Sequence, residues 1–244
     1  MTDAQGRLFP EMATGPRLRP MFSFFGSKWR LAPHYPPPKH DLIIEPFAGS
    51  SAYALTYPDR EVLLIDRDAS VIATWRYLLA ASPADIMSLP DRVEHVDEVP
   101  AEARAFVGFW LAKGTTTPQV TATAWARKWW TEDRALVWGP AVKRRVATQL
   151  PSIRHWQVLE GDYSEAPDLK AAWFIDPPYA VAAGRHYRHN AIDYGALGSW
   201  CRARRGQVIV CEDSTSTWLP FRPLRGTKGT RRDSMDAVYL QDGA

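Results

Sequence analysis

A stiff polar tetrapeptide directly follows an apolar run, and this junction constrains the fold more than any other stretch. Residues 171–175 read Ala-Ala-Trp-Phe-Ile, and Asp176-Pro177-Pro178-Tyr179 follows. An apolar run that ends at an acid and two prolines is typical of a buried strand leading into a rigid loop. Each proline lacks an N–H donor, so the loop offers mainly acceptors, beside an aromatic ring. This arrangement suits gripping an amino group on a planar base, whereas the alternative is a strand-end turn with a capping Asp.

A tight turn is predicted between residues 45 and 51. The apolar run 42–44 precedes Glu45-Pro46-Phe47-Ala48-Gly49-Ser50-Ser51, which is typical of a buried strand, a turn and a helix start. Gly49 lets the backbone approach a ligand closely, because glycine has no side chain to obstruct it. Ser50 or Ser51 can cap the helix that follows. The turn is therefore a candidate ligand site.

An acid ends the second predicted strand. The apolar run 62–65 is followed by Asp66-Arg67-Asp68. In doubly wound sheets, an acid at the end of the second strand accepts hydrogen bonds from ribose hydroxyls. We therefore expect Asp66 to bind a cofactor ribose, and Asp68 to cap the next helix, whose apolar residues recur at helical spacing through Leu79. Either acid alone could act only as a cap.

These motifs resemble those of the N6-adenine DNA methyltransferases that use S-adenosylmethionine and carry an Asp-Pro-Pro-Tyr motif. The similarity is greatest to the DNA adenine methylase branch, where cofactor motifs come first, a target-recognition segment follows and the catalytic motif comes late. It extends from about Phe22 to Leu240, strongly only in short islands. It implies an α/β, Rossmann-like methyltransferase fold, with a mostly parallel sheet, helices on both faces, an antiparallel closing hairpin and a small helical insertion.

The resemblance and the breaks in the apolar pattern together divide the chain into segments. We expect a flexible leader at 1–20, a catalytic domain formed by 21–80 and 151–244, and a helical target-recognition insertion at 81–150. The length of 244 residues suits one α/β domain with such an addition. The hairpin is expected from 220–224 and 236–240.

Two further segments gain a role only from the resemblance. The segment Phe22–Arg30 resembles the family's opening motif, with Lys28 near the cofactor carboxylate or the catalytic loop. The pair Asp162-Tyr163 resembles residues that line the cofactor's adenine. Ser27 and Ser51 stand where the family has glycine, and each segment alone could be a plain turn. The expected cofactor-binding residues are Phe25, Gly26, Lys28, Glu45, Pro46, Phe47, Gly49, Asp66, Asp162, Tyr163 and Asp176.

Basic residues cluster beside aromatic ones in the expected insertion. Two or three helices are predicted there, from the apolar positions within 106–111, 125–129 and 142–150. Such basic residues suit phosphate contacts with DNA, whereas the alternative is a helical subdomain with core tryptophans and solvated charges. The candidate DNA-binding residues of this segment are Arg127, Lys128, Lys143, Arg144 and Arg145, the last three placed on the outward side of their helix.

Two later basic segments are also candidates for DNA contacts. The loop 184–190 contains Arg185 and Arg188, which could hold phosphates that flank an extruded nucleotide. The basic stretch 225–232 joins the two strands of the expected hairpin. The alternative for each residue is exposure to solvent without a role.

The expected function is methyl transfer from S-adenosylmethionine to N6 of adenine in double-stranded DNA, after base flipping. The exocyclic nitrogen is a poor nucleophile, so acceptors at Asp176 and the Pro177 carbonyl would favour attack on the methyl group, while Tyr179 stacks on the base. Two alternatives remain: transfer to N4 of cytosine, and a catalytically inactive DNA-binding module. A methyltransferase acting on RNA or a small molecule is a more distant third.

Composition excludes several other classes. Cys201 and Cys211 lack zinc-site spacing, so no metal is expected. No apolar run approaches the roughly 20 residues that span a bilayer. The N-terminus also lacks a secretion pattern, so we expect a cytoplasmic, monomeric protein. The formal net charge of +3 is too small to indicate nucleic acid by itself.

A short motif interrupts the expected leader. Gln5, Leu8 and Phe9 have the Gln-x-x-Leu-Phe form that resembles peptides by which DNA-processing proteins bind the bacterial sliding clamp. Two adjacent apolar side chains on a flexible tail suit capture by a preformed groove. The alternative is an accidental match.

Overall fold

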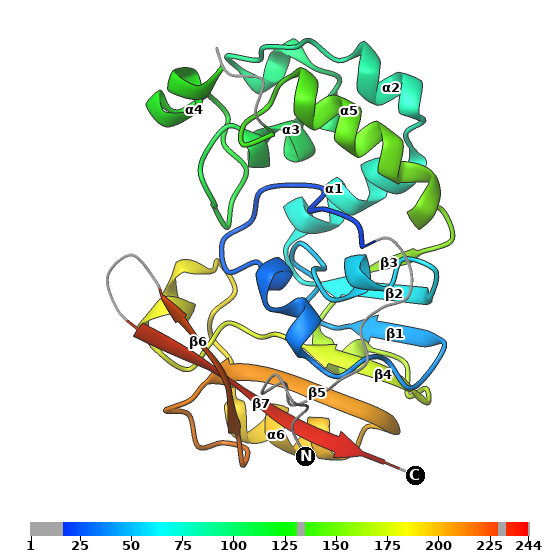
Figure 1. Cartoon of the computed structure of the whole chain (residues 1–244), viewed down its shortest axis with the longest axis vertical. Coiled ribbons are helices and arrows are strands. Elements are labelled where there is room, and N and C mark those ends of the chain that lie inside the picture. Colours follow the sequence, from blue (N-terminus) through cyan, green and yellow to red (C-terminus); the bar gives the residue numbers. More distant parts are fainter. Residues whose placement is uncertain (1–16, 131–134, 229–232, 244) are drawn as a thin grey trace, which may run out of the picture.

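Seven strands form one sheet in the order β3-β2-β1-β4-β5-β7-β6 (Figure 1). The computed structural model describes residues 17–130, 135–228 and 233–243. The sheet is parallel from β3 to β5, and β7 pairs antiparallel with both β5 and β6. The strands are β1 (Leu42–Glu45), β2 (Glu61–Asp66), β3 (Gln157–Glu160), β4 (Ala171–Ile175), β5 (Gly206–Asp213), β6 (Arg222–Lys228) and β7 (Asp233–Asp242). The prediction of an α/β fold with a mostly parallel sheet and an antiparallel edge is therefore confirmed.

Two apolar cores cover the two faces of the sheet. Alternate residues of a strand point to opposite faces, so Ile43 belongs to one core and Ile44 to the other. All five residues of β4 are buried, as expected for an interior parallel strand. The helix α1 (Ala69–Ala80) packs on one face, and α6 (Tyr194–Arg202) packs on the opposite face. The apolar runs of the sequence thus become buried strands between two helical layers.

Capping residues set the start of both helices on the sheet. The side chain of Asp68 accepts a hydrogen bond from Ser70 N at the start of α1, at 2.9 Å. Asp193 does the same for Ala196 N at the start of α6, also at 2.9 Å. The expected capping role of Asp68 is therefore confirmed.

The strand order reverses between β1 and β4. The chain passes from β1 to β2 on one side, and later returns to β4 on the other side of β1. In open α/β sheets, ligands bind beyond the carboxyl ends of the strands at this switch point. Glu45 ends β1 and Ile175 ends β4, so the 45–51 turn and the Asp-Pro-Pro-Tyr segment lie at that place.

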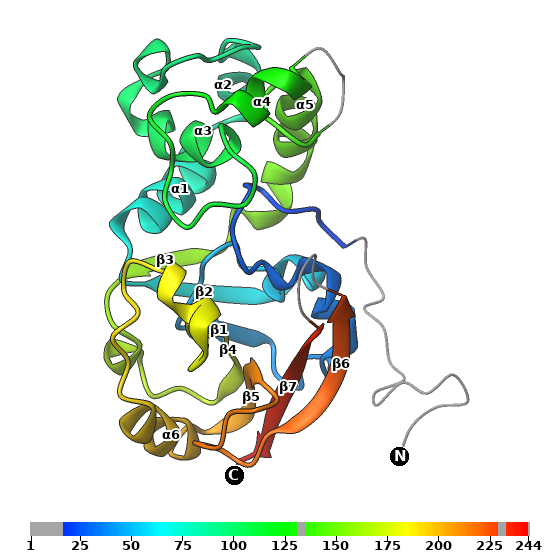
Figure 2. The ribbon, with the colours of Figure 1, turned by 90° about the vertical axis from the view of Figure 1, so that its left-hand side faces the viewer.

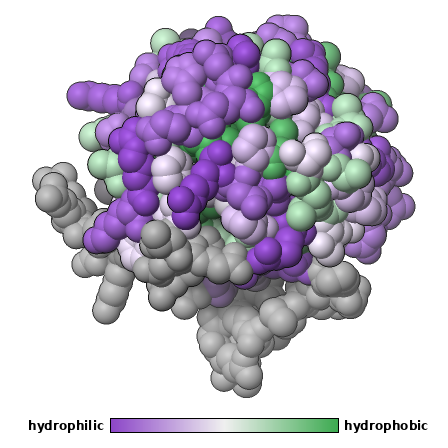
Figure 3. Space-filling view, turned by 90° about the horizontal axis from the view of Figure 1, so that it is seen from above, coloured by the Kyte–Doolittle hydropathy of each residue, from purple (hydrophilic) through white to green (hydrophobic). Residues whose placement is uncertain are grey.

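The segment between α1 and β3 forms the helical end of the molecule, above the sheet in Figures 1 and 2. Helices are present in all three predicted ranges, and α2 is an additional one that begins at a capping box of Ser82 and Asp85. Its apolar core is continuous with that on the α1 face of the sheet. Seen from above, its surface is mostly hydrophilic, with a small hydrophobic area (Figure 3). The helices are α2 (Pro83–Ser88), α3 (Arg104–Trp110), α4 (Ala124–Trp129) and α5 (Pro140–Gln149).

The first described residues are packed, contrary to the expected leader boundary. Leu18 is buried, and its N–H donates to Leu55 O at 2.9 Å. The guanidinium of Arg17 lies 4.0 Å from the ring centre of Trp29. Residues 17–20 thus pack against the rest of the chain and do not belong to a flexible leader. Gln5, Leu8 and Phe9 lie outside the described residues.

Two local expectations also differ from the structure. The serine-capped helix after Gly49 is instead a short 3₁₀ turn, Ala54–Thr56, without a side-chain cap, and Ser50 Oγ donates to Ser27 Oγ at 2.9 Å. The hairpin strands extend beyond the expected bounds of 220–224 and 236–240. Residues 225–228 of β6 also pair, and their partners are residues 233–236 of β7. Of the basic stretch 225–232, residues 229–232 lie outside the described residues.

Lys143 is buried, contrary to its expected outward position. Its ammonium donates to the carbonyl oxygen of Leu89 and, at 2.7 Å, to Asp91 Oδ1. Its side chain is only 5% exposed, so it does not reach solvent to contact a phosphate. Lys143 therefore joins α5 to the end of α2. The triplet 143–145 was misread because three successive charges appear solvated in a sequence, whereas a helix turns each to a different side.

We predict that Lys143→Ala lowers the free energy of unfolding by roughly 1–3 kcal/mol, because a buried carbonyl and a carboxylate lose a charged donor. Chemical denaturation monitored by tryptophan fluorescence measures this. Lys128→Ala is the matched control, since Lys128 is exposed on α4, and its effect should stay within about 0.5 kcal/mol. Equal stability of the two variants would contradict the structural role of Lys143.

Candidate active site

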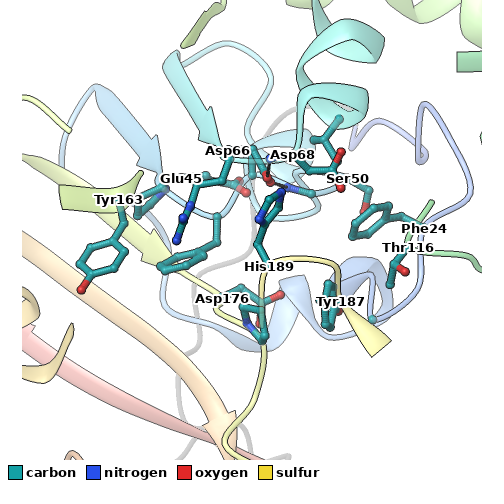
Figure 4. Close-up of a pocket in the computed structure, with 18 of the residues that line it drawn as sticks. Phe24, Glu45, Ser50, Asp66, Asp68, Thr116, Tyr163, Asp176, Tyr187 and His189 are labelled. Carbon is teal, nitrogen blue, oxygen red and sulfur yellow. Dashed lines mark hydrogen bonds between the residues drawn. The ribbon is translucent and has the colours of Figure 1, made fainter. Parts of the chain in front are cut away.

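A cavity of about 240 Å³ lies at the carboxyl ends of β1, β2 and β4. Gly49, Asp66 and Asp176 line it together, so the structure brings the three central sequence candidates to one place. Figure 4 shows Asp176 and Tyr187 on one side of the cavity and Asp66 and Asp68 on the other. All expected cofactor-binding residues line this cavity, namely Phe25, Gly26, Lys28, Glu45, Pro46, Phe47, Gly49, Asp66, Asp162, Tyr163 and Asp176.

Asp66 fixes the turn that contains Gly49. Its Oδ2 accepts from Gly49 N and its Oδ1 from Asp68 N, both at 2.9 Å. On the other side of the turn, Trp75 Nε1 donates to Gly49 O at 2.9 Å. Burial raises the pKa of Asp66 to about 6, and the two backbone donors oppose this shift. Each carboxylate oxygen keeps one lone-pair direction for a ligand, so Asp66 can hold the turn and still accept from a hydroxyl.

The same turn has a left-handed backbone at two positions. Gly49 has φ +44°, and a Cβ there would lie 3.1 Å from the ring of Phe24. Ser51 has φ +52°, a conformation that glycine adopts without cost. Ser51 stands where the methyltransferases that the sequence resembles have glycine. It thus adopts a backbone conformation typical of glycine, at a modest strain cost.

Glu45 connects the end of β1 to the 3₁₀ turn that follows the Gly49 turn. It is almost fully buried, and its Oε1 accepts from Ala54 N at 2.7 Å. Burial raises the pKa of Glu45 to about 8, which the Ala54 hydrogen bond opposes. Glu45 therefore carries a proton at neutral pH.

Lys28 and Asp176 form an ion pair in the floor of the cavity. Lys28 Nζ lies 2.9 Å from Asp176 Oδ1 and donates to Gly26 O at 3.1 Å. Burial lowers the pKa of Lys28, but Asp176 together with Tyr187, Cys211 and Asp236 outweighs this effect and raises the pKa above its usual value. Burial raises the pKa of Asp176, and Lys28 opposes this shift.

Residues from later elements hold the Asp-Pro-Pro-Tyr loop. Tyr194 OH donates to Pro178 O at 2.7 Å, from the first residue of α6. Ala180 N donates to Glu212 Oε2 at 3.1 Å. Glu212 lies near the end of β5, and its side chain is fully buried. Sequence reasoning missed both. The signal for Glu212 was an acid directly after the apolar run 208–211.

A second cavity of about 630 Å³ adjoins the first. Pro177 and Tyr179 line it, whereas Asp176 and Pro178 line the first cavity. The loop thus separates the two cavities. The residues that line both are Phe24, Phe25, Gly26, Ser27, Lys28 and Tyr187.

Aromatic rings form one end of the first cavity. The rings of Phe47 and Tyr163 stack with centroids 5.4 Å apart and planes 26° apart. Asp162 caps the short turn that begins at Tyr163, and its Oδ2 lies 3.3 Å from Arg67 Nη1. This end combines flat apolar surfaces with a carboxylate, as a purine site requires.

The segment 182–193 lies over the first cavity. Tyr187 OH donates to Phe25 O at 3.2 Å, and Arg188 Nη1 lies 3.6 Å from Asp68 Oδ1. In Figure 4, His189 extends toward Asp66 and Asp68. Gly26 permits this packing, since a Cβ there would lie 2.1 Å from Tyr187 OH. Arg188 thus faces the mouth of the first cavity, and half of its side chain remains exposed.

A loop from the helical end reaches both cavities. Thr115 O accepts from Phe25 N at 3.1 Å, and Thr116 Oγ1 donates to His186 O at 2.8 Å. Thr116 lines the first cavity, whereas Lys113 and Gly114 line the second. The helical segment therefore touches the roof and the mouth of the site.

The other basic candidates lie outside the cavities. Arg127 donates to the Glu94 carboxylate through Nε and Nη2, and Arg145 donates to Ala135 O and Pro20 O, each at 3.2 Å. Burial lowers the pKa of Arg145 to about 10. Arg127 thus links two parts of the helical segment, and Arg145 links this segment to Pro20. The side chains of Arg127, Lys128, Arg144 and Arg185 are exposed.

No protein-family model matches the chain, and a search of curated proteins found no similar sequence. Within the described ranges, no group of three or more His, Cys, Asp or Glu residues could hold a metal ion. In the same part of the chain, every helix is too short or too polar to cross a bilayer.

We predict that Glu45 makes the protein less stable as the pH rises toward 8. The folded state keeps the proton of Glu45 up to about pH 8, whereas the unfolded state loses it near pH 4.5. The contribution of Glu45 to the free energy of unfolding is therefore complete below pH 4.5. It decreases between pH 4.5 and about pH 8, by a total on the order of a few kcal/mol. Glu45→Gln keeps the acceptor for Ala54 but cannot ionise. Denaturation between pH 5 and 8.5 should show wild-type stability falling relative to this variant, and parallel curves would contradict the shift.

Proposed function

We propose that the protein is an S-adenosylmethionine-dependent DNA methyltransferase that acts on N6 of adenine. The observation that carries the proposal is the position of the Asp-Pro-Pro-Tyr loop between two cavities. Asp176 faces the cavity that contains the Gly49 turn, and Tyr179 faces the other. Such an arrangement suits two reactants that meet at one carboxylate. The strand order, with its switch point at β1 and β4, is that of doubly wound nucleotide-binding folds and supports a Rossmann-like methyltransferase fold.

The first cavity fits the cofactor. Phe47, Tyr163 and Asp162 would hold its adenine, and Asp66 its ribose. Asp176 Oδ1, in the cavity wall, meets the Lys28 ammonium at 2.9 Å and keeps a lone pair that a polar ligand in the cavity can use. When bound, the cofactor supplies an electrophilic methyl group on a positively charged sulfur.

The chain's own residues would prepare the nucleophile. The Asp176 carboxylate would accept a hydrogen bond from one N–H of the adenine amino group, and the Pro177 carbonyl would accept one from the other N–H. Both acceptors also stabilise the positive charge that develops on the nitrogen, because they are fixed in advance and shielded from water. Lys28 is the partner of Asp176 in the ligand-free protein. The amino group would therefore compete with the Lys28 ammonium for one carboxylate.

The second cavity would receive the extruded base, with Tyr179 as its stacking surface. Extrusion costs a few kcal/mol, which contacts to the flanking phosphates offset. Lys128, Arg144 and Arg185 are exposed and basic, and Lys113 lies at the mouth of this cavity. The insertion would thus recognise the DNA. The protein would act as a monomer in the cytoplasm.

The decisive experiment incubates the protein with isotope-labelled S-adenosylmethionine and a set of duplexes, then digests the DNA to nucleosides. We expect label in N6-methyladenine, at one sequence context. Label in N4-methylcytosine would favour the alternative base, since its amino group poses the same chemical problem. Cofactor binding without transfer to any duplex would favour an inactive module or another substrate.

We predict that Asp176→Ala reduces methyl transfer by at least roughly a hundredfold, because the acceptor for the amino group is lost. Binding of the duplex, measured by fluorescence anisotropy, should stay within a few-fold of wild type. The control is Asp59→Ala, which removes an exposed acid outside both cavities. An unchanged transfer rate in Asp176→Ala would show that its proposed role is wrong.

We predict that Asp66→Ala weakens cofactor binding by roughly tenfold or more, because the variant loses an acceptor and the support of the Gly49 turn. Isothermal titration calorimetry with S-adenosylmethionine measures this. Asp59→Ala again serves as the control. Wild-type affinity in Asp66→Ala would place the ribose elsewhere.

A further inference from the structure

A hydrogen bond joins the loop tyrosine to the last strand of the sheet. Tyr179 OH donates to Asp236 Oδ1 at 2.9 Å, across 57 positions of sequence. Asp236 lies on β7 and is 7% exposed. Both residues line the second cavity. A buried carboxylate is costly unless it is hydrogen-bonded, so this contact accounts for part of the placement of Asp236.

The backbone of Asp236 has a separate task. Asp236 is paired with Asp213 of β5 in the antiparallel ladder, and with Arg225 of β6 on its other side. Any residue can supply these backbone groups, including alanine. The side chain, in contrast, meets the tyrosine that the proposed mechanism uses. The carboxylate is therefore separable from the sheet by substitution.

The contacts of Tyr179 restrict how its ring can lie. Lys28 Nζ is 4.6 Å from the ring centre, on one face of the ring. The hydroxyl at the far end of the ring is held by Asp236. The ring borders the second cavity, and a ring held at its hydroxyl presents a constant plane to a base that stacks on it.

We propose that Asp236 is a positioning residue that holds the Tyr179 ring in the plane required for stacking on the extruded base. The proposal rests on the proposed function, because it gives the second cavity the role of the base pocket. Asp236 acts through the tyrosine and does not touch the reacting atoms.

The test compares four variants: Asp236→Ala, Asp236→Asn, Tyr179→Phe, and the double variant of Asp236→Ala with Tyr179→Phe. We expect Asp236→Ala and Tyr179→Phe each to lower the single-turnover transfer rate roughly ten- to a hundredfold, while the Kd for S-adenosylmethionine stays within threefold. Asp236→Asn keeps an oxygen that accepts from the hydroxyl, so it should restore the rate to within a few-fold of wild type. The double variant should be no slower than Tyr179→Phe alone.

A spectroscopic signal reports stacking separately from stability. With 2-aminopurine at the methylated position, the bound base should fluoresce more strongly in Asp236→Ala than in wild type, because less stacking means less quenching. The control is Asp242→Ala, which removes an exposed acid of the same strand that pairs with Lys39. It should match wild type in rate and fluorescence.

Three outcomes would overturn the inference while the wild-type protein methylates DNA: a wild-type rate in Asp236→Ala, an Asp236→Asn rate as low as that of Asp236→Ala, or additive losses in the double variant. Absence of DNA methylation by the wild-type protein would instead overturn the proposed function, and this inference with it. The two failures are therefore distinguishable.

Discussion

The ion pair between Lys28 and Asp176 connects the two halves of the site. Lys28 follows the N-terminal aromatic turn, and Asp176 follows β4, so one contact fixes the distance between segments almost 150 residues apart. Two buried charges cost free energy individually and are tolerated because they are paired. The same pair lies where the two cavities meet, since Lys28 lines both. The loop, the turn and the second cavity all take their positions around it.

Much of the fold could be predicted because its signals are local. Apolar runs of three to five residues, each ended by Glu or Asp, located β1, β2 and β4, and the capping acid Asp68 located the start of α1. These features depend on neighbours within a few residues. The residues expected to bind a cofactor lie together around the first cavity, because the carboxyl ends of parallel strands meet at one edge of the sheet.

The rest depends on partners that are distant in sequence. Lys143 appeared solvated, yet its partners lie more than 50 residues away in the segment after α2. Glu212, Tyr194 and Asp236 hold the central loop, and nothing in the sequence shows which distant residues they contact. The roof of the first cavity, too, depends on a loop from the helical segment that meets residues near 186. Such contacts require the tertiary structure.

The position of β7 has a consequence for how the protein matures. This strand follows β6 in the chain but lies between β5 and β6 in the sheet. While a ribosome is still making it, β5 has an open edge and Tyr179 lacks its acid. The nascent chain therefore carries most of the residues of the first cavity before the second cavity is complete, because the latter needs Asp236 from the late strand.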